Sequence, residues 1–260
     1  MLELFEEKIA EHTGAKHTIA CINGTSALQV SLRLAGVEQG DEVIVPTLTF
    51  IAPVNASAYN GASPIFMDAD MYYNIDAEKT IEFIQTKTVF KGSATYNKTT
   101  GKLIAAIIPV HVWGNAAWLD ELVSLCEERN IAVVEDASES LGTFYITGKY
   151  KGRHTGNVGK LGCLSFNGNK IITTGGGGMI LTDDQELADK ARYLITQAKN
   201  DPICYIHHEI GYNFRLTNIQ AALGVAQLEQ LPFFLKHKHE IFNQYQTAVD
   251  NIAGLTMAGV

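Results

Sequence analysis

The sequence predicts an α/β protein in which helices cover both faces of a mostly parallel sheet. Short apolar runs rich in Val and Ile alternate along the chain with longer segments whose apolar residues recur every three or four positions, which is the pattern of β-α-β units. The 260 residues are 46% hydrophobic and 18% charged, so they can bury a large core. We therefore expect a three-layer α/β/α architecture.

The individual elements follow from these two patterns in chain order. Apolar runs predict the strands, and segments of helical period lie between them. The predicted strands are residues 18–22, 42–45, 64–67, 103–110, 131–134, 163–166 and 179–181. The predicted helices include residues 26–35, 50–59, 117–129 and 184–195.

Three segments depart from this alternation. Residues 86–102 are polar and are expected to form an inserted loop or hairpin, whereas residues 144–152 alternate around a turn and are expected to form a β-hairpin. A long helix is expected from Thr217, because Thr217 and Gln220 have the spacing of a capping box. Pro232 should kink or split that helix, since proline lacks the N–H group that the helix needs.

Composition argues against two classes of partner. The chain carries 20 basic and 28 acidic residues, a net charge of −8, and no basic run, so a nucleic-acid partner is not expected. The longest apolar stretch, residues 103–112, is about half of the ~20 residues that a membrane helix needs, so no membrane partner is expected either. Because the first residues are acidic and amphipathic, unlike a signal peptide, we expect a cytoplasmic protein.

The four cysteines show neither a CxxC motif nor metal-ligand spacing, and apolar residues surround them in the sequence. They are Cys21, Cys126, Cys163 and Cys204. The paired histidines near positions 207 and 237 lack a third ligand at usable spacing. We therefore expect buried, reduced thiols and no metal site.

The first motif that could form part of a functional site is the segment from Asn23 to Leu28, NGTSAL. It lies at the end of a predicted strand and the start of a predicted helix. Free backbone N–H groups, the positive end of the helix dipole and two hydroxyls could hold a phosphate there. An ordinary helix cap explains the same residues, because Ser and Thr are common at that position.

The second motif is residues 135–140, EDASES, directly after the buried run 131–134. Acidic residues at the carboxyl end of a central strand lie where open α/β sheets bind ligands, and one acid could pair with a buried cation such as a pyridinium nitrogen. The alternative is a solvated turn or acids at a helix N-terminus.

The third motif is residues 165–178, SFNGNKIITTGGGG. Small and apolar residues flank Lys170, so desolvation could free its amine to attack a carbonyl group. The glycines would let the backbone approach a flat ligand or turn tightly. A surface lysine beside a hairpin is the alternative.

Taken in order, these three motifs, together with PTLTF at 46–50 and GYNFRLTNIQAA at 211–222, resemble the DegT/DnrJ/EryC1/StrS family of pyridoxal-phosphate (PLP) sugar aminotransferases. The resemblance covers almost the whole chain. It implies the large, cofactor-binding domain of fold type I PLP-dependent transferases. Within the family, the residues of these motifs most resemble those of the branch that makes precursors of bacterial nonulosonic acids such as legionaminic acid.

The resemblance assigns a role to each matching residue. It implies that the Lys170 amine forms the covalent link to the cofactor aldehyde and later moves the proton, and that Asp136 pairs with the pyridinium nitrogen. The remaining residues that it places around the cofactor are Gly24, Thr25, Ser26 and Ser165 at the phosphate, Phe50 stacked on the ring, Glu139 near the ring oxygen and Asn213. Asn213 falls where the family reaches across a dimer interface to the neighbour's cofactor phosphate, which implies a homodimer with shared active sites.

The sequence departs from the family pattern in three respects. Glu139 stands where many members have Gln or His, and Gly176 replaces the more usual acid of TTGEGG. Family members also carry a segment before the region matching residues 2–11 and a small domain after the region matching residue 253. We therefore expect residues 1–250 to form the PLP-binding large domain, truncated at both ends, and residues 251–260 to begin a missing C-terminal small domain.

The predicted activity is transfer of an amino group, with glutamate as the expected donor, to a keto group of a nucleotide-linked sugar in surface-glycan or nonulosonic acid biosynthesis. One alternative is a PLP-dependent sugar dehydratase of the same fold, which Lys170 disfavours because histidine can replace the lysine in that group. The other alternative is a non-catalytic PLP-binding fragment.

Overall fold

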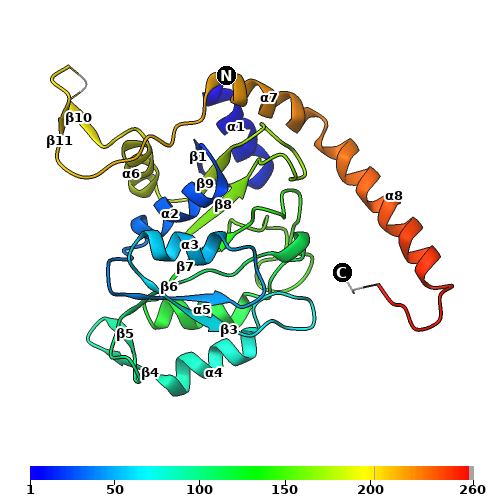
Figure 1. Ribbon diagram of the computed structural model, residues 1–260, viewed down its shortest axis with the longest axis horizontal. Coiled ribbons are helices and arrows are strands. Elements are labelled where there is room, and N and C mark those ends of the chain that lie inside the picture. The colour runs from blue at the N-terminus through cyan, green and yellow to red at the C-terminus, as the bar shows by residue number, and fades with distance from the viewer. Residues whose placement is uncertain (202, 258–260) are drawn as a thin grey trace.

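The computed structural model describes residues 1–201 and 203–257, and it places a seven-stranded sheet at the centre of the molecule (Figure 1). In spatial order the strands are β1 (His17–Cys21), β9 (Gly178–Thr182), β8 (Leu161–Ser165), β7 (Ala132–Asp136), β6 (Ile104–Ile107), β2 (Glu42–Pro46) and β3 (Ser63–Met67). Only β9 pairs antiparallel with its neighbours in this sheet, so the other strands end at the same edge. The predicted α/β class and mostly parallel sheet are confirmed.

Helices cover both faces of the sheet, as predicted. They are α1 (Leu2–Thr13), α2 (Gly24–Leu34), α3 (Ala52–Tyr59), α4 (Ala77–Lys87), α5 (Asp120–Glu128), α6 (Gln185–Ile195), α7 (Asn218–Glu229) and α8 (Leu231–Val249). Side chains alternate across the sheet: in β2, Val43 and Val45 pack in the core beside α2, α3 and α6, whereas Ile44 packs beside α4 and α5. In β9, Ile180 joins the first core, and its neighbours pack beside α1 and α7. Each strand thus binds two helical layers together.

The structure confirms all seven predicted strands and shifts some of their ends. The strand predicted for 103–110 ends at Ile107, although Val110 still forms an isolated parallel bridge with Asp136. The four predicted helices are present as α2, α3, α5 and α6, with starts and ends that differ by up to three residues from the predicted ones. The helix α4 was not assigned from the sequence.

Two irregular segments have different outcomes. Residues 86–102 contain the hairpin of β4 (Thr88–Lys91) and β5 (Ala94–Asn97), which confirms one of the two forms expected there. Residues 144–152, predicted as a hairpin, turn back on themselves without forming strands. Phe144 makes an isolated antiparallel bridge with His154, and Tyr145 forms backbone hydrogen bonds with Gly152 and Arg153. The Asp120 carboxylate accepts the N–H of Lys149 at 2.6 Å and ties the tip of this turn to α5.

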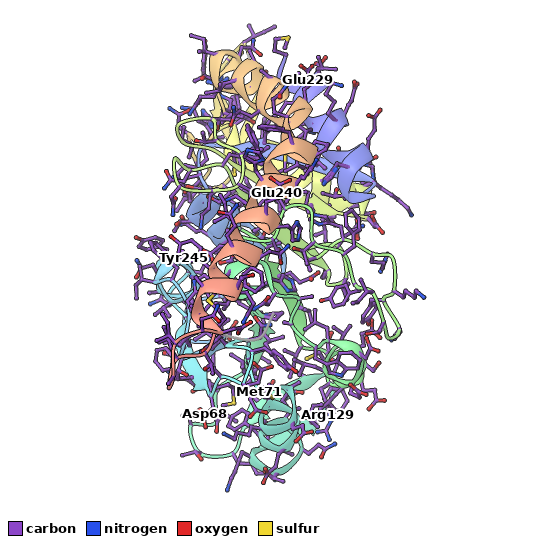
Figure 2. The ribbon with its side chains drawn as sticks, turned by 90° about the vertical axis from the view of Figure 1, so that its right-hand side faces the viewer. Asp68, Met71, Arg129, Glu229, Glu240 and Tyr245 are labelled. Carbon is purple, nitrogen blue, oxygen red and sulfur yellow. The ribbon has the colours of Figure 1, made fainter. Side chains whose placement is uncertain are left out.

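The helical segment that follows Thr217 agrees in detail with the prediction from the sequence. Thr217 and Gln220 form the predicted capping box at the start of α7. The helix breaks at Gln230, so that Pro232 occupies the first turn of α8, where its missing N–H group costs nothing. Helix α8 runs along one side of the molecule past Glu240 and Tyr245, and Leu231 is its one buried residue (Figure 2).

The expectation of buried thiols is correct for three cysteines and wrong for Cys204, which is exposed. Cys204 lies between β10 (Lys199–Asp201) and β11 (Ile206–His207), a short pair outside the main sheet. Apolar neighbours in the sequence do not bury a residue there, because the pair projects from the body (Figure 1). Within the described residues, no helix is long and apolar enough to cross a membrane.

The buried histidine His154 makes the stability depend on pH. Its Nε2 accepts the N–H of Gly142 at 3.0 Å and its Nδ1 donates to the Thr155 carbonyl, so the neutral ring is the form that fits. Burial lowers the pKa of His154 to about 4, whereas the unfolded chain has an ordinary histidine. The stabilisation is therefore complete above pH 6.5 and is lost as the pH falls towards 4.

We expect His154 to contribute about 2 kcal/mol less to the free energy of unfolding at pH 5 than at pH 7.5, as measured by urea unfolding. His154→Gln cannot titrate and should lose less unfolding free energy over that interval than the wild type. The nearby His12, whose pKa burial also lowers, is present in both proteins and cancels in the comparison. Equal losses in the two proteins would contradict the assignment.

Candidate active site

A cavity of about 730 Å³ opens at the edge where the parallel strands end. The segments that follow β1, β6, β7 and β8 contribute its walls, which is where open α/β sheets bind ligands. Seven of the predicted site residues line it: Gly24, Thr25, Phe50, Asp136, Glu139, Ser165 and Lys170. Residues that are far apart in the sequence are thus brought together by the order of the strands.

One end of the cavity is the N-terminus of α2. The Asn23 side chain caps this helix by accepting the N–H of Ser26 at 2.8 Å. The preceding N–H groups, of Gly24 and Thr25, have no partner within the helix and carry the positive end of its dipole. A Cβ at Gly24 would lie 2.9 Å from the Ser165 Cβ and 3.2 Å from the Ser138 Oγ, so only glycine lets these hydroxyl residues close around the helix end. This end suits a phosphate.

Asp136 lies on the cavity wall at the end of β7. Its side chain is only 4% exposed and accepts the N–H of Ser138 at 3.0 Å. Burial is the largest influence on its carboxyl group and raises the pKa, against the lowering effects of the Ser138 hydrogen bonds and the Lys170 charge. A buried carboxylate is a suitable counter-ion for a cationic nitrogen of a ligand.

Lys170 follows β8 and enters the cavity beside Glu139. Its Nζ lies 3.1 Å from the Glu139 Oε1 and 5.9 Å from the centre of the Phe50 ring. The Lys170 side chain is 13% exposed, so it is not the surface lysine of the alternative interpretation. The Phe50 ring is 72% exposed and remains available to cover a flat ligand.

Two predicted site residues lie outside the cavity lining. Ser26 is buried in the first turn of α2, and the cap of that helix uses its N–H group. Asn213 is exposed and forms an isolated bridge with Thr196. Their predicted contacts with a cofactor phosphate stay predictions.

Sequence reasoning missed Trp113, which lines the cavity and donates its backbone N–H to the Glu139 Oε2 at 3.0 Å. It belongs to a short 3₁₀ turn, η1 (Val112–Gly114), directly after the strand β6 and its extension. The available signal was a Trp-Gly pair close behind the carboxyl end of a predicted strand, where ligand-binding loops are found. Trp113 has a φ of 53°, which a bulky residue rarely adopts.

A buried hydrogen-bonded pair, Glu135 and His111, lies beside the cavity. Glu135 and His111 have no exposed surface, and the His111 Nε2 lies 2.9 Å from the Glu135 Oε2. The Glu135 carboxylate also accepts the N–H groups of Gly156, Val158 and Gly159 at 2.6 to 2.9 Å. Burial would raise the pKa of Glu135, but the hydrogen bonds from His111 and from the backbone outweigh it and lower the pKa.

Glu135→Gln should therefore cost about 3 kcal/mol of unfolding free energy, because the amide turns a donor towards buried backbone N–H groups that then lack an acceptor. Urea unfolding at pH 7 measures this cost. Glu229→Gln, at the end of α7, is a matched exchange near the surface and should change stability by less than about 0.5 kcal/mol. Equal stability of the two variants would contradict the role of Glu135.

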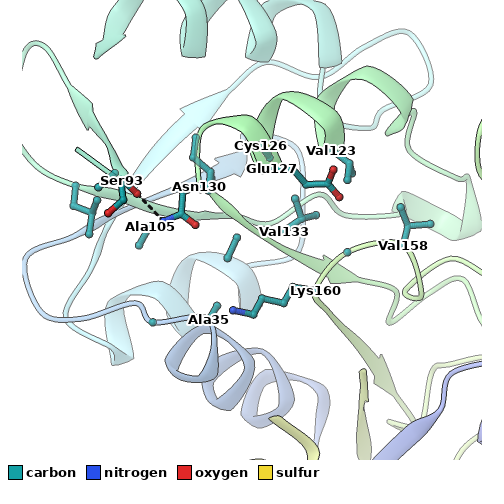
Figure 3. A pocket seen from close by; sticks show the side chains of 16 residues that line it. Ala35, Ser93, Ala105, Val123, Cys126, Glu127, Asn130, Val133, Val158 and Lys160 are labelled. Atoms are coloured by element: carbon teal, nitrogen blue, oxygen red, sulfur yellow. Dashed lines mark hydrogen bonds between the residues drawn. The ribbon is translucent and has the colours of Figure 1, made fainter. Parts of the chain in front are cut away.

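A second cavity, of about 620 Å³, lies at the opposite edge of β6 and β7 (Figure 3). Asn130 borders it and donates to the Ser93 carbonyl at 2.7 Å, and Lys160 lies on its other side. None of the predicted site residues lines it. Among the residues that the structure describes, no cluster of three or more His, Cys, Asp or Glu side chains could hold a metal ion.

Comparison with known proteins identifies the same family as the sequence motifs. The model of the DegT/DnrJ/EryC1/StrS aminotransferase family matches residues 1–259. The chain is 39% identical, over 98% of its length, to a putative pyridoxal phosphate-dependent aminotransferase, EpsN, from Bacillus subtilis. It is 40% identical, over 96% of its length, to a GDP-perosamine synthase from Escherichia coli O157:H7.

Solved structures agree with this match. A crystal structure of a DegT DnrJ EryC1 StrS aminotransferase from Brucella abortus superposes with a TM-score of 0.83 at 33% identity and covers 96% of this chain. That comparison covers 64% of the Brucella chain, and the matches above cover 62% of EpsN and 64% of the perosamine synthase. The chain therefore spans less than two thirds of the length of these relatives.

Proposed function

The chain belongs to the DegT/DnrJ/EryC1/StrS aminotransferase family, whose members are PLP-dependent, and from this premise we propose that it transfers an amino group to a keto group of a nucleotide-linked sugar. The observation that carries the proposal is the cavity itself. It combines a helix N-terminus for a phosphate, a buried carboxylate and an amine within one space of about 730 Å³.

The residues present fit pyridoxal phosphate. The space that Gly24 leaves open between Ser165 and Ser138 suits the phosphate, and the buried Asp136 suits the ring nitrogen. Lys170 provides the amine, and Phe50 provides an aromatic face. When bound, this cofactor supplies an aldehyde that condenses with amines and a protonated ring that accepts electrons from the adjacent carbon.

Each side chain has a separate task in the proposed reaction. Lys170 holds the cofactor covalently and then moves a proton as general base and acid. The Asp136 carboxylate keeps the proton on the ring nitrogen. The first turn of α2, with Ser165, binds the phosphate and fixes the ring position. Glu139 holds the Lys170 amine in place between the cavity wall and the ring face.

Three finer features belong to the same proposal. We infer that glutamate is the amino donor, that the enzyme works in the cytoplasm and that it acts as a homodimer in which Asn213 serves the neighbour's site. The exposure of Asn213 outside its own cavity supports the dimer. We also propose residues 1–250 as the cofactor domain and residues 251–260 as the start of the next domain, although residues 258–260 lie outside the described residues.

Absorption spectroscopy of the purified chain with PLP tests the proposal. A lysine-linked band in the visible region should disappear when glutamate is added, and one equivalent of 2-oxoglutarate should form. A sugar dehydratase would leave glutamate unconsumed, and a non-catalytic fragment would keep the band. Keto-sugar nucleotides of several classes, including nonulosonic acid precursors, should then be compared for recovery of the band. No covalent binding of PLP at all would overturn the proposal.

A further inference from the structure

The buried pair of Glu135 and His111 is linked to the cavity, although neither residue lines it. The roles proposed above use Lys170 and Asp136 and leave this pair without a task. His111 is connected to its surroundings through both ring nitrogens and through its backbone. These connections lead to the amine of Lys170.

The first connection fixes the state of the His111 ring. Its Nδ1 accepts the N–H of Ala117 at 3.1 Å, so the ring proton must lie on Nε2, which donates to the Glu135 carboxylate. The ring thereby ties together the first and last residues of the loop 111–117. A histidine in this tautomer forms hydrogen bonds to the loop and to the sheet at the same time.

The second connection is made by the loop itself. It carries Trp113, whose backbone N–H donates to one oxygen of Glu139 at 3.0 Å, while the other oxygen lies 3.1 Å from the Lys170 Nζ. The left-handed conformation of Trp113 is strained for a bulky side chain and persists only where the surrounding structure enforces it. The His111 ring holds the two ends of the loop that carries Trp113.

We propose that His111 is a positioning residue for the Lys170 amine, because its ring holds the loop 111–117 so that the Trp113 N–H keeps the Glu139 carboxylate beside Lys170. The role of Lys170 rests on the proposed function, whereas the contact by which His111 holds the loop 111–117 does not. The ionisable groups that face the amine are Glu139, in direct contact, and Asp136.

Two substitutions of His111 separate holding the loop from pairing with Glu135. His111→Asn keeps an acceptor near the position of Nδ1 for the Ala117 N–H and loses the contact with Glu135. His111→Gln keeps a donor near the position of Nε2 for Glu135 and loses the contact with Ala117. If the ring acts by holding the loop, the Gln variant carries the functional defect and the Asn variant is mainly less stable.

The first measurement uses the cofactor-free protein. The chain has two tryptophans, so a Trp118→Phe background leaves Trp113 as the single fluorescent tryptophan. In that background His111→Gln should increase the fast, nanosecond depolarisation of Trp113 emission, and His111→Asn should not. Equal depolarisation in the wild type and the Gln variant would overturn the proposal.

The second measurement uses the PLP-loaded protein. Glu139 lies 3.1 Å from the Lys170 amine, so a loosened Glu139 should leave that amine poorly placed for proton transfer in His111→Gln. Amino transfer should slow about tenfold in kcat with KM for the donor unchanged. An unchanged kcat, or equal losses of kcat in the Asn and Gln variants, would overturn the proposal.

Two further variants complete the test. Thr143→Val removes only the hydroxyl that donates to the Gly114 carbonyl at 2.9 Å, so it loosens the same loop even if the Gln variant does not fold. Trp113 depolarisation and kcat should therefore change in the same direction as in His111→Gln, and unchanged values of both contradict the proposal. His154→Gln makes the same exchange at another buried histidine and should leave kcat unchanged. If no visible band forms in any protein, the proposed function fails, and Trp113 depolarisation still decides whether the ring holds the loop.

Discussion

Replacement of Lys170 by alanine should lower the rate of amino transfer by at least about 10³-fold and abolish the lysine-linked visible band of the PLP-loaded protein. Among the described residues, Lys170 is the one lysine or histidine that lines the cavity, so no other such side chain is there to replace its amine. The phosphate end of the site is untouched by the substitution, so the variant should still bind PLP, without a covalent bond. Absorption spectra and the release of 2-oxoglutarate from glutamate measure both effects.

Two controls separate the chemistry of Lys170 from its charge. Lys170→Arg keeps a cation beside Glu139 but remains protonated, so it should be as inactive as the alanine variant. Lys236→Ala removes an amine that is 75% exposed on α8 and should leave the rate within about twofold of the wild type. A Lys170→Ala protein that keeps the visible band and the rate would remove the central assignment.

The sequence was sufficient for the sheet and for most of the cavity because both depend on local patterns. Each parallel strand is buried on both faces and appears as a short apolar run, and site residues such as Asp136 and Lys170 follow directly after such runs. Strand order then brings the ends together without further information. The capping box at Thr217 was equally local.

The features that sequence reasoning missed depend on contacts between distant segments. The segment 144–152 has the alternation of a hairpin and makes a few antiparallel backbone hydrogen bonds, but no strands form, and its tip is bound to Asp120 on α5. Trp113 becomes part of the site only because Glu139, 26 residues later, accepts its N–H. Cys204 has apolar neighbours in the sequence and still lies in solvent, since burial is decided by where a segment packs.

Asp136→Asn should also reduce amino transfer by about 10³-fold, but for a different reason. Asparagine has the same shape and still accepts the Ser138 N–H, so the cavity keeps its form. It has no charge with which to keep a proton on the ring nitrogen, and the bound cofactor then accepts electrons poorly. The visible band should persist in this variant, which distinguishes it from Lys170→Ala. A rate close to that of the wild type would contradict the role of Asp136.

The stability of the same variant provides an independent check, because the neighbouring carboxyl groups of β7 have pKa shifts of opposite sign. The pKa of Asp136 is raised by burial, so its ionisation opposes folding; this cost develops as the pH rises from the ordinary aspartate pKa to the raised one and is constant above it. The pKa of Glu135 is lowered, so its ionised form favours folding and is lost only in acid. Without cofactor at pH 7, Asp136→Asn should therefore be at least as stable as the wild type in urea, whereas Glu135→Gln should be clearly less stable. Such a pair of results is expected where a strand holds one acid for structure and the next acid for chemistry. Destabilisation of both variants by the same amount would show that Asp136 also serves the fold.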